Sequence, residues 1–103
     1  MDVKETLKER QGTHGAFSEN AVASQALKTT ITNQKSTHVY LDAVQQEVLD
    51  VICAKIARII TGDPDHTDSW HDIAGYAMLA EQDITDKYKD TGKEPWVGHV
   101  DEQ

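Results

Sequence analysis

Four acidic residues have types and spacing that favour metal chemistry. Glu47 and Asp50 stand three positions apart in an apolar run, so their carboxylates converge if the run is helical. Asp68 and Asp72 follow a Gly-Asp-Pro turn and stand one helical turn apart. Such oxygen ligands suit Mg²⁺, which would hold substrate phosphates and activate a water. The alternative is structural, because acids at a helix start stabilise the helix dipole without a metal.

Two basic residues are the candidate phosphate ligands. Lys55 and Arg58 lie one turn apart, and an arginine can hold a phosphate in bidentate fashion. A structural alternative stays open, in which they pair with Asp72 or Glu47 while their stems cover apolar surface. We expect Lys55, Arg58 and Asp72 to converge where two helices meet.

The apolar run that contains these residues predicts a central helix from Asp42 to Thr61. Its Val, Leu and Ile residues cover about half of a helical wheel, which is typical of a helix packed on more than one side. Asp42 is the expected N-cap, with Gln45 as its capping-box partner. Thr61-Gly62 marks the end of the helix, with Gly62 as C-cap.

A second long helix is expected from about Asp68 to Lys87. The link Gly62–Thr67 is short, and short links make antiparallel neighbours. Helical spacing assigns the core face of this helix to Trp70, Ile73, Ala74, Ala77, Ile84 and Tyr88. An earlier helix, from about Glu19 to Gln34, would begin at an N-cap Ser18, with Phe17 and Val22 as a hydrophobic staple.

These patterns predict an all-α fold, a small helical bundle built on a central antiparallel hairpin. The chain reads as one domain over residues 1–103, with 1–17 and 93–103 as flexible or strap-like ends. A homo-oligomer, most simply a dimer, is expected because the central helix is apolar over so wide an arc. The second long helix also favours an oligomer, because it carries further small and apolar residues outside its expected core face, which are Gly75, Met78 and Leu79.

Charge and composition limit the partners. The formal net charge of −8 disfavours nucleic acid and an anionic membrane surface, and permits a basic protein surface. No apolar stretch is long enough for a membrane span and no signal peptide is visible, so a cytoplasmic protein is expected. The single cysteine, Cys53, excludes an intramolecular disulfide and is expected to be a buried thiol.

Two segments carry a resemblance to a known family. They are Lys55-Ile56-Ala57-Arg58-Ile59 with Gly62-Asp63-Pro64, and Asp68-Ser69-Trp70-His71-Asp72-Ile73-Ala74-Gly75-Tyr76-Ala77. Together they resemble small uncharacterised phage and prophage proteins that are distantly similar to the MazG-like all-α nucleoside triphosphate pyrophosphohydrolases. The upstream segment His14–Ala21 resembles that family's early Gly-and-Asn element. The similarity spans roughly Arg10 to Glu81.

The resemblance implies a Mg²⁺–nucleotide site. It makes Glu47 and Asp72 the expected catalytic residues, with Glu47, Asp50, Asp68 and Asp72 as metal ligands and Lys55 and Arg58 as nucleotide-binding residues. MazG-like enzymes carry a Glu-x-x-Glu pair and a Glu-x-x-Asp pair on successive helices. Here Glu47-Val48-Leu49-Asp50 stands for the first pair, whereas Ser69 occupies the acidic position three residues before Asp72.

Two functions therefore compete. The first is a nucleotide-binding phage protein, either a Mg²⁺-dependent pyrophosphohydrolase or a degenerate relative that only binds nucleotides. The second is a non-enzymatic acidic accessory protein that binds a host protein, or sequesters a signalling nucleotide, in an anti-defence role. The Lys–Arg–Asp grouping favours the first, and the acidity and the missing carboxylate favour the second.

Overall fold

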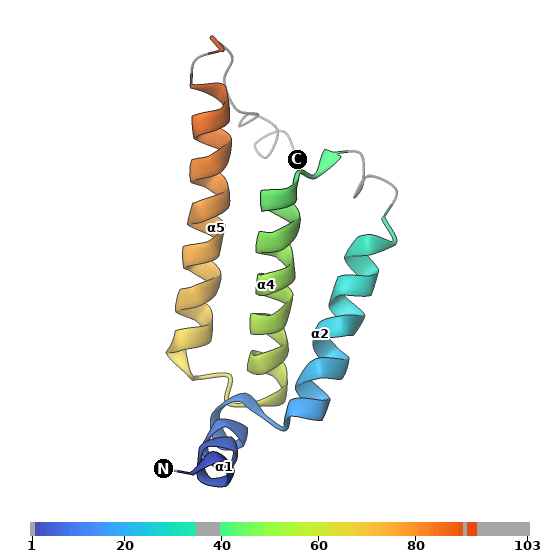
Figure 1. Ribbon diagram of the computed structural model, residues 1–103, viewed down its shortest axis with the longest axis vertical. Coiled ribbons are helices and arrows are strands. Elements are labelled where there is room, and N and C mark those ends of the chain that lie inside the picture. The colour runs from blue at the N-terminus through green and yellow to red at the C-terminus, as the bar shows by residue number, and fades with distance from the viewer. Residues whose placement is uncertain (1, 35–39, 90, 93–103) are drawn as a thin grey trace.

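The chain folds into helices alone over the residues that the computed structural model describes, which are 2–34, 40–89 and 91–92. The helices are α1 (Val3–His14), α2 (Phe17–Thr32), α4 (Ala43–Thr61) and α5 (Thr67–Tyr88). In Figure 1, α2, α4 and α5 stand side by side with α4 in the middle, and α1 lies across their lower end. The predicted all-α bundle is confirmed. No helix in these ranges is long and apolar enough to cross a membrane.

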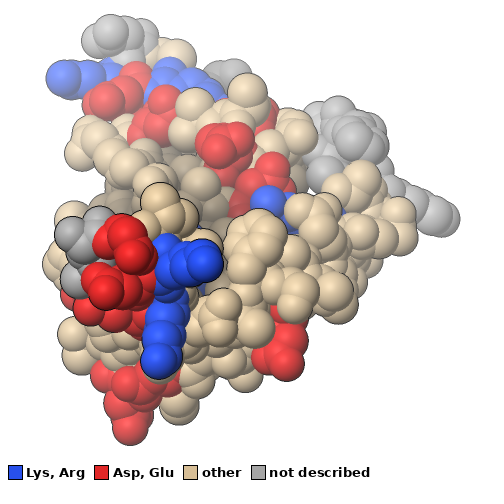
Figure 2. Space-filling view, turned by 60° about the horizontal axis from the view of Figure 1, so that its bottom comes forward, with Lys and Arg blue, Asp and Glu red and all other residues tan. Residues whose placement is uncertain are grey.

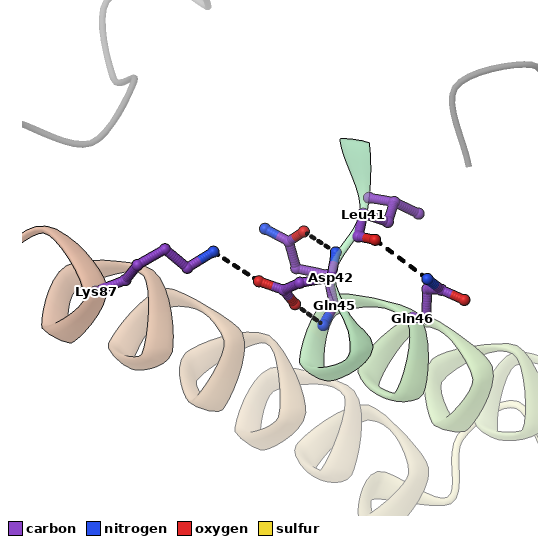
Figure 3. A network of polar contacts seen from close by, with 5 residues as sticks. All are labelled: Leu41, Asp42, Gln45, Gln46 and Lys87. Atoms are coloured by element: carbon purple, nitrogen blue, oxygen red, sulfur yellow. Dashed lines mark hydrogen bonds and ion pairs between the residues drawn. The ribbon is translucent and has the colours of Figure 1, made fainter. Parts of the chain in front are cut away.

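The predicted hairpin of α4 and α5 is held at both ends by ion pairs. Lys87 Nζ of α5 lies 2.6 Å from the Oδ2 atom of Asp42 at the start of α4. Nearer the other end, Lys55 Nζ of α4 lies 2.9 Å from the Oδ2 atom of Asp72. Asp42 also accepts a 2.8 Å hydrogen bond from the Gln45 backbone N–H, and the Gln45 side chain accepts one from the Asp42 N–H (Figure 3). The predicted capping box therefore also ties the start of α4 to the end of α5.

The apolar core is thin and lies on two sides of α4. Its buried members are Val48, Cys53, Ala57 and Ile59. At 100° per residue, Val48 and Ile59 lie beside Lys55, which pairs with α5, so this side faces α5. Cys53 and Ala57 lie on the other side, where Lys28 of α2 acts on the Cys53 thiol. Among the described residues α2 and α5 do not contact each other, so the three helices form one layer.

The N-terminal segment differs from the prediction. Residues 3–14 form α1 rather than a flexible or strap-like end, and α2 begins at Phe17 with Ala16 as N-cap, not Ser18. The proposed staple is wrong because Phe17 is 82% exposed and Val22 is 72% exposed. Helix α2 begins earlier than predicted because Gly15, with a φ of 81°, turns the chain immediately after α1. The other predicted end, 93–103, lies outside the described residues.

Helix α5 is rotated from its predicted setting. Ile73, Ile84 and Tyr88 are half-buried as expected, but Trp70, Ala74 and Ala77 are exposed. The side toward α4 is centred on buried Ser69 and half-buried Tyr76 and Ala80, because the pair between Lys55 and Asp72 fixes the rotation. One flank of the apolar arc of α5 is therefore left uncovered.

Candidate anion-binding site

The predicted convergence of α4 and α5 is found for Lys55 and Asp72. The Lys55 side chain is 16% exposed and its ammonium lies 2.9 Å from the Asp72 carboxylate. The hydrogen bond from Lys55 holds the pKa of Asp72 below its usual value, with the Lys55 charge adding to the effect. The structural alternative thus describes Lys55 in this chain, since its charge is already neutralised by a carboxylate.

Arg58 does not join this pair. Within the described residues its guanidinium has no carboxylate within 4.0 Å, so the predicted structural pairing with Asp72 or Glu47 is wrong. The reason is rotational, because a three-residue step leaves the Arg58 side chain about 60° around the helix axis from the Lys55 side chain, on the flank that lines the contact with α1 and α2. Arg58 therefore points toward α1 and α2, while Lys55 points toward α5.

The four predicted metal ligands are spread along the hairpin. Glu47 precedes Lys55 by eight residues, so it lies about 12 Å along the axis from the level of Asp72, and Asp50 lies between these levels. Asp68 is exposed beside His66, with 3.5 Å between the carboxylate and the imidazole. In the part of the chain that the structure describes, no three His, Cys, Asp or Glu side chains gather to hold a metal. These residues do not fit a Mg²⁺ site within one chain.

A cavity of about 310 Å³ opens instead between α1, α2 and α4. Its lining includes the polar side chains of Arg10, Gln11, His14, Asn20, Ser24 and Arg58. Leu7, Phe17 and Ala54 add apolar surface. The volume is at the lower end of the range for small-molecule pockets.

Backbone contacts position this cavity. The α1–α2 corner packs on the α4–α5 turn, where a Cβ at Gly15 or Gly62 would collide with backbone atoms of the other segment. The Asp63 N–H donates to the Thr13 carbonyl at 2.9 Å. The Thr61 hydroxyl and the Asn20 amide both donate to the carbonyl of His14. Gly15 and Gly62 thus allow His14 to be held between three segments of the chain.

The electrostatics of the cavity favour an anion. Burial lowers the pKa of His14, and the charges of Arg58 and Arg10 lower it further. His14 Nδ1 is buried without a hydrogen-bond partner among the described residues, and its ring stacks edge-on to His66 at 5.4 Å. Arg10, like Arg58, has no ion pair with a described carboxylate. The first turn of α2, which borders the cavity, has no side-chain cap for its N–H groups.

Arg10 and His14 were missed by the sequence reasoning, and Arg58 alone was identified. One signal was present: the chain has only two arginines, and both line this cavity. The segment His14–Ala21, which supplies the corner, was identified for its resemblance and for the predicted N-cap and staple, but not as part of a binding site. Nothing in the local pattern shows that the end of α1 meets Arg58, which is more than forty residues away.

Comparison with known proteins gives a family and no function. Residues 2–84 match the family model described as "Domain of unknown function (DUF6378)". No curated protein and no solved structure matches. The resemblance to phage proteins and MazG-like enzymes therefore stays a prediction. The matched range contains α1, α2, α4 and most of α5, and so the whole cavity. The chain belongs to the DUF6378 family.

Proposed function

We propose that this protein binds a phosphorylated small molecule, a nucleotide, in the cavity between α1, α2 and α4. The observation that carries the proposal is that both arginines of a chain with a net charge of −8 meet at one cavity without carboxylate partners. Cations left unpaired in an acidic protein are expected where an anion binds, because a ligand phosphate supplies the missing countercharge.

Each lining group has a role in this binding mode. Arg10 and Arg58 donate to the phosphate oxygens, and the free N–H groups of the first turn of α2 donate beside them. His14 Nδ1 can add a donor once the imidazole is protonated. Phe17 lines the rim and is 82% exposed, so a nucleobase can stack on its ring. That exposed aromatic ring favours a nucleotide over free phosphate.

Nucleotide hydrolysis is not part of the proposed function. The pyrophosphohydrolase activity that the resemblance implies requires Mg²⁺ on Glu47, Asp50, Asp68 and Asp72, and these carboxylates are not gathered within the chain. The cavity needs no metal to bind phosphate, because its own cations supply the charge. Our proposal is therefore binding, and Mg²⁺-dependent catalysis stays a prediction.

Isothermal titration of the protein with nucleoside di- and triphosphates, with and without Mg²⁺, tests the proposal. Arg58→Gln should weaken binding by about tenfold or more, because a hydrogen bond to a charged group contributes roughly 1.5–3 kcal/mol. Lys89→Gln is the matched control, since it removes the same charge at the far end of α5. Absence of binding to the unaltered protein, or an equal loss in both variants, would contradict the proposal.

The net charge supports a second candidate, the acidic accessory protein that binds a basic host protein. In Figure 2, which looks toward the α1 end, Lys and Arg side chains form small groups next to Asp and Glu. No broad basic surface is seen on that face. If no nucleotide or pyrophosphate binds, the acidic surface becomes the better supported site, and its association with a basic partner should weaken with salt.

A further inference from the structure

A broad apolar face crosses the three-helix layer on the side opposite the cavity. We call it the layer face. Its members are Ala23 and Leu27 of α2, Leu49, Ile52, Ile56 and Ile60 of α4, and Trp70, Ile73, Ala77 and Ile84 of α5. In the chain itself these side chains are half-buried or exposed, with Ile60 at 65% and Trp70 at 55%. No described helix covers this side.

Helix rotation fixes which residues share the face. On α4, Arg58 and Ala54 point toward the cavity, and Ile52 and Ile56 lie about half a turn away from them. On α5, Asp72 lies on the same side of the layer as Lys55, so Ala77 and Trp70 lie on the opposite side. On α2, Ala21, Ser24 and Gln25 line the cavity, and Ala23 and Leu27 lie about 60–160° around the helix axis from them, on the other flank of the contact with α4. The three apolar stripes are therefore continuous.

We propose that a second copy of this chain packs on the layer face. Helix α4 has 19 residues and is about 28 Å long, and neighbouring helices pack about 8–10 Å apart. Three helices thus offer a face of roughly 700 Å², close to the ~800 Å² that each partner buries in a stable interface. Burying a few half-exposed isoleucines per chain also compensates for the thin internal core.

Charge distinguishes a second copy from other occupants. A chain with a net charge of −8 repels its own copy through any surface that carries the acids. From Leu49 to Ile60, α4 places no charged residue on the layer face, so two copies can meet along α4 without opposing like charges, and the acid of α5 nearest to this face is the exposed Glu81, one turn after Ala77. A basic partner would find no acid of α4 on this face to pair with. The proposal is independent of the nucleotide site, which is on the opposite side of the layer.

Light scattering coupled to gel filtration tests this proposal on the full chain. The expected mass is twice the 11.5 kDa of one chain. Ile60→Glu and, separately, Ala77→Glu should reduce the mass to that of one chain while circular dichroism shows unchanged helix content. Val22→Glu is the matched control, because Val22 is 72% exposed on the outer side of α2 and should leave the dimer intact.

Two results would overturn the proposal. One is the mass of a single chain for the unaltered protein at every concentration, which would also follow if residues 93–103 of the same chain covered the face. The other is a dimer that Val22→Glu disrupts as strongly as Ile60→Glu does, which would place the interface elsewhere.

Discussion

Replacing Gly15 by alanine should destabilise the protein strongly, because this residue forms the corner that builds the cavity. Its φ of 81° and ψ of 175° lie in a region used essentially by glycine, and another residue there costs on the order of 1–3 kcal/mol. The new Cβ would also collide with the Thr61 carbonyl, displacing the turn that bonds to Thr13 and His14. Each weakened hydrogen bond adds about 0.5–1.5 kcal/mol.

The expected total for Gly15→Ala is about 2–4 kcal/mol, a large part of the roughly 5–15 kcal/mol that stabilises a domain. Chemical denaturation measures this loss, and the melting temperature should fall by about 10 °C or more. Gly12→Ala and Gly75→Ala are the controls, since both positions are helical with open space around the new Cβ. They should stabilise by about 0.5–1 kcal/mol. A Gly15→Ala protein as stable as these controls would refute the corner as described.

Three further predictions concern the core and the titrating groups. Ile59→Ala should cost about 2–4 kcal/mol in urea unfolding, whereas Ile60→Ala, at 65% exposure, should cost far less; equal losses would contradict the assigned rotation of α4. Burial and Arg58 hold the pKa of His14 below its ordinary 6.5, so the unfolded chain binds more protons and the free energy of unfolding should fall as the pH drops below about 6.5. The same dependence of stability on pH in His14→Gln would contradict this. The hydrogen bond from Lys87 lowers the pKa of Asp42 from 3.8, so the Asp42–Lys87 pair should stabilise the fold above that pH and cease to do so below it. Melting temperatures of the unaltered protein and Asp42→Asn against pH check this, and an equal loss of stability in acid for both proteins would argue against it.

The α4–α5 hairpin is predictable from sequence because its signals are local and mutually consistent. The capping pair of Asp42 and Gln45, the C-cap Gly62 and the apolar period place α4 correctly. Buried Cys53 follows from the same period. The contact of Lys55 with Asp72 follows from a short antiparallel link. Each of these inferences needs only neighbouring residues or a single turn.

Helix α1, the rotation of α5 and the cavity depend on tertiary contacts that no local sequence pattern encodes. Helix α1 buries none of its residues, so hydrophobic periodicity cannot detect it, and backbone contacts through Gly15 and Gly62 hold its end in place. The rotation of α5 was mispredicted because its apolar arc is wider than the contact with α4, leaving Trp70 and Ala77 on the layer face. The cavity joins three separate segments, which only the fold brings together.

Histidine NMR during a pyrophosphate titration tests the central claim most directly, because it reports on the cavity itself. We expect the imidazole signals of His14 to shift in a saturable way and the pKa of His14 to rise, since a bound anion beside Arg10 and Arg58 stabilises the imidazolium. The signals of the exposed imidazole of His71, which does not line the cavity, should not shift with pyrophosphate. A His14 signal that is unmoved by pyrophosphate, or shifts of equal size at His14 and His71, would contradict an anion site in this cavity.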